Sequence, residues 1–445
     1  NRMSARQRFA SQAPLMRHRL LALSSEIPER NPPLLACSVN VDERINQYLL
    51  GSDQIDARLM LLVRRTDSAV PWQDLILPEG VKDRLENFIR GFLKRWECAG
   101  KSEGLILRFQ GPSGAGKEAT AAALCQKLGI PLLVVNTAHL LHGDLSFETA
   151  ASLLCREALV QQAALYFDRY DVLVGEEPKI SYCRETLLQE LERLSGLTFL
   201  AGQGGSEPAG VCRGKYFMRV DFPILAYPLR RQFLQDSLNG LASPDIDLGA
   251  LTNKFHLTFG QMRDAVVMAR SLALWRDPAN GSLASDDLYI ACRSQSNHKL
   301  SSLAIKISPQ YSWSDIVLPQ EQMAQIRELL NYVKYRDVVY GVWGFAQKLS
   351  LGKGLNVLFS GLSGTGKTMA AEIIARELGL DLYKIDLSLV VSKYIGETEK
   401  NLSAIFREGK DSNAILFFDE ADALFGKRSE VKDAHDRYAN IETAY

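Results

Sequence analysis

One stretch of the sequence decides the fold class: Gly361-Leu362-Ser363-Gly364-Thr365-Gly366-Lys367-Thr368-Met369. Up to Thr368 it fits the phosphate-binding loop pattern G-x-x-x-x-G-K-[ST] at every fixed position. Glycines let the backbone approach a polyphosphate closely. The N–H groups of such a loop, and of the helix that follows, hold negative oxygens. We therefore predict a nucleotide site in which Lys367 reaches the terminal phosphates and the Thr368 hydroxyl binds Mg²⁺.

The residues on both sides of the loop have the pattern of an α/β fold. Residues 355–359 (LNVLF) have the composition of a buried strand, and Thr368 to Leu378 have the periodicity of an amphipathic helix. A chance glycine-rich turn would not be expected to stand between such a strand and such a helix. The order of strand, loop and helix therefore favours a parallel-sheet nucleotide-binding module.

Two carboxylates follow a second apolar run, Ile415 to Phe418. Residues at the end of such a strand lie at the carboxyl edge of a parallel sheet, where ligands bind. We predict that Asp419 holds Mg²⁺, directly or through water, and that Glu420 polarises the attacking water. The alternative is a core strand that ends in solvated acids, which the nearby loop disfavours.

Length, charge and cysteines restrict the class of protein. A chain of 445 residues is too long for one core, so we expect several domains. Its formal net charge of zero argues against a chain-wide attraction to nucleic acid or membranes. The seven cysteines are scattered, and we expect them reduced in a cytoplasmic protein. No apolar run approaches the roughly 18 residues of a membrane span, so we expect none.

The chain contains a long internal repeat. Trp72 recurs as Trp313 (313 − 72 = 241), and Lys117 recurs as Lys367 (367 − 117 = 250). Two further landmarks recur in the same order, Leu128-Gly129-Ile130 as Leu378-Gly379-Leu380 and Asp168 as Asp419. The nearly constant offset predicts two copies of one large module rather than a short-repeat solenoid.

The two copies differ where the chemistry lies. In the first copy Gly114, Gly116 and Lys117 remain, but Glu118 replaces the magnesium-binding hydroxyl and Arg169 replaces the water-activating carboxylate. A guanidinium stays protonated at neutral pH and cannot accept a proton. We therefore expect the first copy to bind nucleotide weakly or not at all and not to hydrolyse it.

These observations predict an α/β protein with two tandem modules. The expected parts are a small helical N-terminal part with a basic start (1–66), a degenerate α/β module (67–228), its helical lid (229–295), a polar linker (296–312) and a second α/β module (313–445). The arginines near the N-terminus indicate either an arm for nucleic acid or a partner, or a solvated helix face, and we favour the latter.

From Trp313 onward the sequence resembles the AAA ATPases that thread polypeptides through a hexameric ring. The resemblance rests on Gly361 to Thr368, on Asp419 and Glu420, and on Val391 to Glu399 (VSKYIGETE). It implies ATP and Mg²⁺ as cofactors, a homo-oligomeric ring and a protein substrate. It also implies a pore loop of Lys393, Tyr394 and Ile395, with Tyr394 as the gripping aromatic. The alternative is a surface tyrosine in a turn.

The whole arrangement resembles tandem AAA proteins with an N-terminal winged-helix-like part, found beside phage-tail-like contractile injection systems. Leu34 to Leu50 would be the tail of that part. In the second copy only 26 residues follow Asp419 (445 − 419 = 26). We therefore expect the sequence to stop before a sensor strand and a lid, and to hydrolyse ATP poorly as written.

Three functions are compatible with the sequence. The first is an ATP-driven remodeller that pulls a protein by Tyr394. The second is a nucleotide-gated scaffold that hydrolysis only resets. The third is a DNA-associated ATPase using the basic N-terminal segment, which the neutral charge and the lack of stacking aromatics there disfavour.

Overall fold

The computed structural model describes most of the chain. The described residues are 9–10, 13–24, 37–66, 71–77, 80–98, 104–175, 177–204, 215–238, 246–278, 281–296, 304–345, 354–385, 390, 398, 401–403, 405–406, 409 and 414–421. The chain forms two compact units, Asn1–Pro223 and Ile224–Tyr445. None of the described helices is both long and apolar enough to cross a bilayer.

The described part of the first unit is built on a six-stranded sheet with the order β3-β5-β6-β7-β4-β8. Neighbouring strands are parallel except β3, which runs antiparallel to β5. The strands are β3 (Val63–Thr66), β4 (Gly104–Gln110), β5 (Leu132–Asn136), β6 (Ala164–Asp168), β7 (Gly196–Gly202) and β8 (Tyr216–Asp221). The central strands are apolar on both faces, as expected for a sheet covered on both sides.

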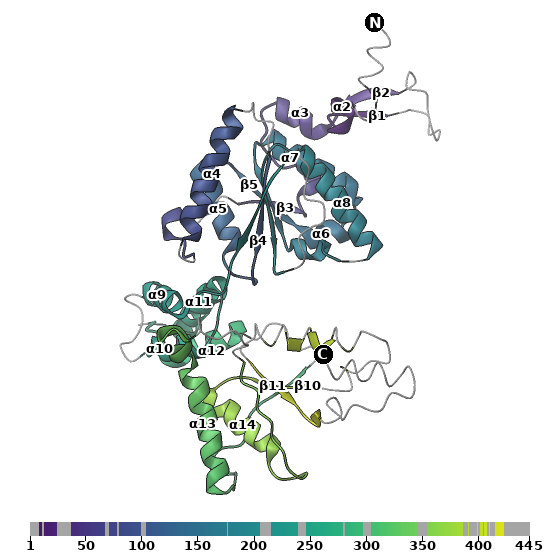
Figure 1. Ribbon diagram of the computed structural model, residues 1–445. Coiled ribbons are helices and arrows are strands. Elements are labelled where there is room, and N and C mark those ends of the chain that lie inside the picture. The colour runs from purple at the N-terminus through teal and green to yellow at the C-terminus, as the bar shows by residue number, and fades with distance from the viewer. Residues whose placement is uncertain are drawn as a thin grey trace, which may run out of the picture. The chain divides into compact units, whose positions relative to one another are not determined.

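Helices cover both faces of this sheet (Figure 1). On one face lie α4 (Val81–Cys98) and α5 (Lys117–Leu128), whose apolar side chains share a core with β4 and β7. On the other lie α6 (Thr137–His142), α7 (Phe147–Val160) and α8 (Pro178–Arg193). The predicted α/β class is therefore confirmed.

The N-terminal residues differ from the small helical part that the sequence predicted. Only α2 (Pro14–Arg17), α3 (Glu43–Leu49) and the 3₁₀ turn η2 (Ala57–Leu59) are helical among the described residues before β3. Between them, β1 (Leu21–Ser24) and β2 (Ser38–Val41) form an antiparallel hairpin. Strand β2 alternates polar and apolar residues, as a strand does, whereas the three apolar residues that begin β1 carry no clear period.

Residues 63–66 also correct the predicted boundary between residues 66 and 67, because they form β3 at the edge of the six-stranded sheet.

Buried ion pairs join the residues before β3 to α7. The Arg44 guanidinium donates three hydrogen bonds to the Glu157 carboxylate, at 2.9 to 3.1 Å. Arg156 donates to Asp56 at 2.6 Å.

The second unit begins with four described helices over residues 227–296, close to the helical segment predicted at 229–295. They are α9 (Tyr227–Leu238), α10 (Leu248–Lys254), α11 (Phe259–Arg276) and α12 (Ser285–Ser296). Helix α11 begins with a capping box between Thr258 and Gln261. These helices lie in the same compact unit as the residues from 304 onward.

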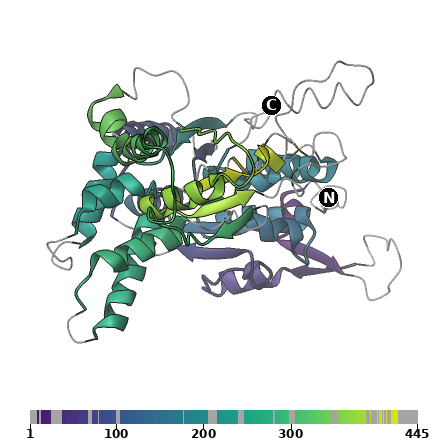
Figure 2. The ribbon, with the colours of Figure 1, turned by 90° about the horizontal axis from the view of Figure 1, so that it is seen from below.

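The described remainder of the second unit contains a three-stranded sheet with the order β11-β10-β9. Its elements are β9 (Ala304–Ile307), α13 (Gln320–Asp337), the π-helical turn η6 (Val338–Val342), α14 (Lys367–Leu378), β10 (Leu382–Ile385) and β11 (Ile415–Phe418). Helix α14 lies beside β10 (Figure 2). The two elements pack through Ala371, Ala375 and Leu382. Strand β9 lies inside the predicted linker 296–312, so that segment is not a linker throughout.

The antiparallel strand pairs β3–β5 and β9–β10 have equivalent registers in the two units. Thr66 pairs with Leu132 in the antiparallel contact of β3 with β5. Ile307 pairs with Leu382 in the antiparallel contact of β9 with β10. Thr66 and Ile307 are 241 residues apart (307 − 66), and Leu132 and Leu382 are 250 residues apart (382 − 132). These are the offsets of the sequence repeat.

The predicted buried strand at residues 355–359 is wrong. Residues 354–360 form no regular element, and Leu358 is 87% exposed. In the first unit, β4 is held between β7 and β8, but the described residues of the second unit supply no such neighbours. Since a strand needs partners for its backbone groups, an apolar composition alone does not create one.

Candidate functional site

The loop before α14 has the backbone expected of a phosphate cradle. Gly364 and Gly366 have φ of 79° and 89°, in the left-handed region that glycine adopts without strain. Gly114 and Gly116 have nearly the same values, 76° and 87°. Gly366 caps α14 without any side-chain hydrogen bond, so the first N–H groups of this helix are available to an anion.

Lys367 and Thr368 stand where the helix meets the loop. The Lys367 ammonium donates to the carbonyl oxygens of Gly361 and Leu362, both at 2.9 Å. The lysine side chain therefore folds back over its own loop. Its ammonium binds two carbonyl oxygens there, and the same ammonium could bind phosphate oxygens instead. Thr368 is half-buried in the first turn of α14.

The two predicted carboxylates follow β11 directly. The Asp419 carboxylate accepts hydrogen bonds from the Lys384 ammonium at 2.7 Å and from the backbone N–H of Glu420 at 3.1 Å. Glu420 is exposed, and its φ of 52° is in the left-handed region. The position of Asp419 at the carboxyl end of a parallel strand agrees with the prediction.

One open cavity of about 2820 Å³ is lined by Lys367, Thr368, Met369, Asp419 and Glu420, among other residues. This exceeds the roughly 300–1,000 Å³ of an ordinary ligand pocket. The predicted loop and carboxylates thus open onto one space.

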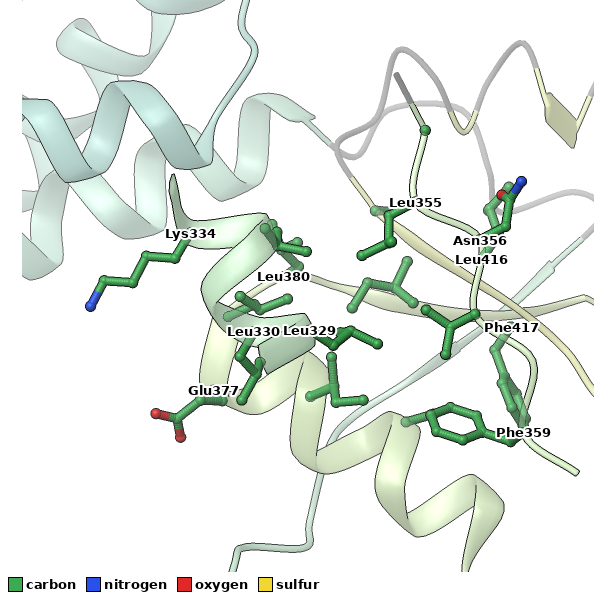
Figure 3. Close-up of a pocket in the computed structure, with 18 of the residues that line it drawn as sticks. Leu329, Leu330, Lys334, Leu355, Asn356, Phe359, Glu377, Leu380, Leu416 and Phe417 are labelled. Atoms are coloured by element: carbon green, nitrogen blue, oxygen red, sulfur yellow. The ribbon is translucent and has the colours of Figure 1, made fainter. Parts of the chain in front are cut away.

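The excess volume has an apolar lining away from the loop. Figure 3 shows Leu329, Leu330 and Leu380 gathered there, while the charged ends of Lys334 and Glu377 point away from these leucines. This part of the cavity lies beside residues 354–359, which are not paired into the sheet.

The residues present suit magnesium. The Thr368 hydroxyl and the Asp419 carboxylate are hard oxygen ligands, the kind that Mg²⁺ prefers together with water and phosphate oxygens. In the described part of the chain, no three His, Cys, Asp or Glu side chains gather into an alternative metal group. When bound, Mg²⁺ would neutralise phosphate charge, and Thr368 and Asp419 would hold it.

The first loop has the same backbone but different side chains. The Lys117 ammonium donates to the carbonyl oxygens of Gly111 at 2.6 Å and Pro112 at 2.7 Å. Burial lowers the pKa of Lys117 to about 8, although the carboxylates of Asp168 and Asp171 oppose that effect. The first cradle thus holds a lysine that loses its charge more easily than an exposed one.

The two substituted positions of the first unit, one in the first turn of α5 and one after β6, are both occupied by charged groups. Glu118, which stands in place of Thr368, forms an ion pair with Arg64 of β3. Arg169, which stands in place of Glu420, has the same φ of 52°. The first unit thus keeps the backbone of the site without its hydroxyl and its second carboxylate.

Two segments of this chain match models of known protein families. Residues 357–441 match the family model of the ATPase family associated with various cellular activities, AAA. This segment is AAA-like. The AAA match begins next to the loop and includes α14, Asp419 and Glu420. Residues 1–63 match the family model of a variant winged helix domain.

Curated relatives are similar over limited regions. An uncharacterized AAA family ATPase, y4kL, of Sinorhizobium fredii is 37% identical over 125 residues, which is 28% of this chain and 36% of the relative. Protein SAV of Sulfolobus acidocaldarius is 33% identical over 134 residues, 30% of this chain and 16% of the relative. The ATPase family gene 2 protein of Schizosaccharomyces pombe is 26% identical over 198 residues, 42% and 24% of the two chains. The matched regions thus span about a third or less of these relatives.

Several predicted site residues lie outside the described residues. These are Lys393, Tyr394 and Ile395 of the predicted pore loop. One residue at the described site was missed by the sequence analysis, namely Lys384 beside Asp419. The sequence feature that could have revealed it is a lysine inside the apolar run Leu382 to Ile385, at a position where the first copy has valine.

Proposed function

We propose that this chain is an ATPase of the AAA family that remodels protein assemblies, with hydrolysis carried by its second unit. The observation that carries this proposal is the meeting of Lys367, Thr368, Asp419 and Glu420 on one cavity. These four side chains provide a cation for phosphate, a hydroxyl and a carboxylate for magnesium, and a base for water. The AAA match of residues 357–441 supports the same reaction.

Each residue has a distinct role in this reaction. The ammonium of Lys367 exchanges its two loop carbonyls for the terminal phosphate oxygens of ATP. The N–H groups at the start of α14 hold the remaining charge. Thr368 and Asp419 would hold Mg²⁺, and Glu420 would accept the proton of the attacking water.

The proposal includes two tandem AAA modules, at 67–228 and 313–445, with a helical segment at 229–295. It is supported by the shared register of the β3–β5 and β9–β10 contacts and by the matching backbone of the two loops. The first module, with Glu118 and Arg169, would bind nucleotide weakly or not at all. It would serve as a structural or sensing part of the assembly.

We further propose a cytoplasmic homo-hexameric ring that grips a protein substrate through Tyr394, flanked by Lys393 and Ile395. This rests on the resemblance of Val391 to Glu399 to a pore loop. The winged-helix match at residues 1–63 supports a winged-helix-like N-terminal part, a feature of the tandem AAA proteins found beside contractile injection systems. Arg19, one of the arginines near the N-terminus, does not favour a free DNA arm, since it donates to Thr149 of α7 at 3.1 Å.

Substitution of the gripping residue tests remodelling separately from hydrolysis. We would compare the wild-type chain with Tyr394→Ala and with Tyr394→Phe, which keeps the aromatic ring. The measurements are phosphate release and the ATP-dependent unfolding of a fluorescent protein with an unstructured tail. Tyr394→Ala should lose unfolding and keep hydrolysis, while Tyr394→Phe should keep both. Equal unfolding by all three proteins would contradict threading and favour a nucleotide-gated scaffold.

A further inference from the structure

Lys384 contacts the magnesium-binding carboxylate and has no counterpart in the first unit. Its ammonium lies 2.7 Å from one Asp419 oxygen, while the other oxygen accepts the Glu420 N–H. The Lys384 and Asp419 side chains are 40% and 34% exposed. The pair is therefore half-buried, and the ammonium has solvent beside it.

The strand register explains how Lys384 reaches Asp419. Lys384 pairs with Phe417 across β10 and β11, so the two side chains share one face of the sheet. On that face Leu382 and Phe417 contact the apolar side of α14. Lys384 therefore extends along the face that carries the phosphate-binding helix, toward the carboxyl edge of the sheet.

The first unit has an apolar residue at the equivalent place. Val134 lies 250 positions before Lys384 and is 4% exposed in the core beneath α5. It pairs with Tyr166 of β6, as Lys384 pairs with Phe417 of β11. A lysine in such a position costs desolvation unless an anion compensates for it, and Asp419 is that anion.

We propose that Lys384 is a tethered counter-ion that holds Asp419 while the site lacks magnesium and competes with Mg²⁺ for this carboxylate. This inference rests on the proposed function. Two cations at one carboxylate repel each other, so Mg²⁺ binding turns the ammonium toward solvent. The consequence is that the site binds Mg²⁺ with lower affinity. When the metal leaves, the Lys384 ammonium returns to the Asp419 carboxylate.

Magnesium dependence of nucleotide binding tests this. A fluorescent ADP analogue would be titrated into the full chain, first in EDTA and then at a fixed analogue concentration with increasing Mg²⁺. Lys384→Met removes the charge and keeps most of the aliphatic stem, whereas Lys384→Arg keeps the charge. Lys334→Met removes a lysine that lines the same cavity but points away from its apolar part (Figure 3).

Lys384→Met should lower the Mg²⁺ concentration at half-saturation by about twofold to fivefold, the range expected for a partly exposed ion pair. The other two variants should match the wild type, and no variant should bind the analogue more tightly in EDTA. Lys384→Gln serves as the neutral variant if Lys384→Met does not fold. An unchanged or raised Mg²⁺ requirement in the neutral variant would overturn the inference.

The proposed function fails in a distinguishable way. If the wild-type chain binds no analogue, or if binding in EDTA persists in Lys367→Ala, the loop is not a nucleotide site. If binding in EDTA depends on Lys367 but the neutral Lys384 variant shows an unaltered Mg²⁺ requirement, only the role of Lys384 is overturned.

Discussion

Glu420 and Arg169 occupy equivalent places after β11 and β6, and both have a left-handed backbone with φ of 52°. For a residue other than glycine this conformation costs on the order of 1 kcal/mol, so the surrounding structure has to impose it. The same backbone therefore presents a carboxylate in one unit and a guanidinium in the other. The difference between the units lies in the side chain rather than in the turn that carries it.

The carboxylate of Glu420 should be needed for turnover and not for binding. Glu420→Gln keeps the shape of the side chain but cannot accept a proton at neutral pH. We expect nucleotide affinity to remain and steady-state hydrolysis to fall by about 10²- to 10⁴-fold, the usual contribution of a general base. Glu377→Gln, at a cavity residue that points away from the apolar lining (Figure 3), is the matched control. Wild-type hydrolysis by Glu420→Gln would remove this residue from the mechanism.

Restoring the hydroxyl of the first loop should improve its nucleotide binding. Glu118 places a negative charge where phosphate and magnesium would lie, and it is paired with Arg64. In a Lys367→Ala background, which disables the second loop, Glu118→Thr should raise Mg·ATP affinity about tenfold, or 1.4 kcal/mol. Glu118→Gln removes the charge without supplying the hydroxyl and should give a smaller gain. No gain in either variant would show that Glu118 does not limit this loop.

Asp381 should hold α12 and β9 against β10 in a pH-dependent way. Its carboxylate is 1% exposed and pairs with Arg293 and Lys306. Burial acts to raise the pKa of Asp381, but hydrogen bonds from Lys306 and Arg293 outweigh it and hold the pKa below its usual value of 3.8. The stabilisation is therefore present above that value and is lost as the pH falls through the lower pKa of the folded state.

Urea unfolding of Asp381→Asn measures this contribution. At pH 7 the variant should lose about 1–3 kcal/mol, as when a buried polar group loses its charged partners. The difference from the wild type should shrink as the pH is lowered below the usual pKa of a carboxyl. A difference that stays constant down to acid pH would assign the effect to packing instead.

The ion pair of Arg44 and Glu157 should fix the N-terminal residues to α7. Their side chains are 1% and 0% exposed, so removing one partner leaves a buried charge. Glu157→Gln should destabilise the first unit by about 3–5 kcal/mol, whereas Arg44→Met combined with Glu157→Leu should recover much of that loss. Thermal unfolding of both variants checks this, and an equal loss in the double variant would argue that the geometry of the pair matters more than its charge.

Local signals predicted much of the second unit. The helix predicted from Thr368 to Leu378 is observed at Lys367–Leu378. Gly379, with φ of 56°, ends it in the left-handed conformation typical of helix C-termini. The strand before Asp419 and the four helices of residues 227–296 were also predictable, because their periodicity and caps lie within each segment.

Contacts between distant segments were not predictable in the same way. Residues 355–359 have strand composition, yet a strand forms only where neighbours pair with it. Strand β9 has only four residues and is defined by its pairing with β10. The contact of Lys384 with Asp419 joins positions 35 residues apart, and only the register of β10 against β11 reveals it. The predicted pore loop stays a prediction.

Binding of Mg·ATP to the full chain and to two lysine variants tests the central claim most directly. Calorimetric titration should find a site that weakens by about tenfold to a hundredfold in Lys367→Ala, the loss expected for a charged hydrogen-bond donor. The same site should persist in Lys117→Ala. Undiminished binding in Lys367→Ala, or loss of the site in Lys117→Ala alone, would contradict a nucleotide site in the second unit.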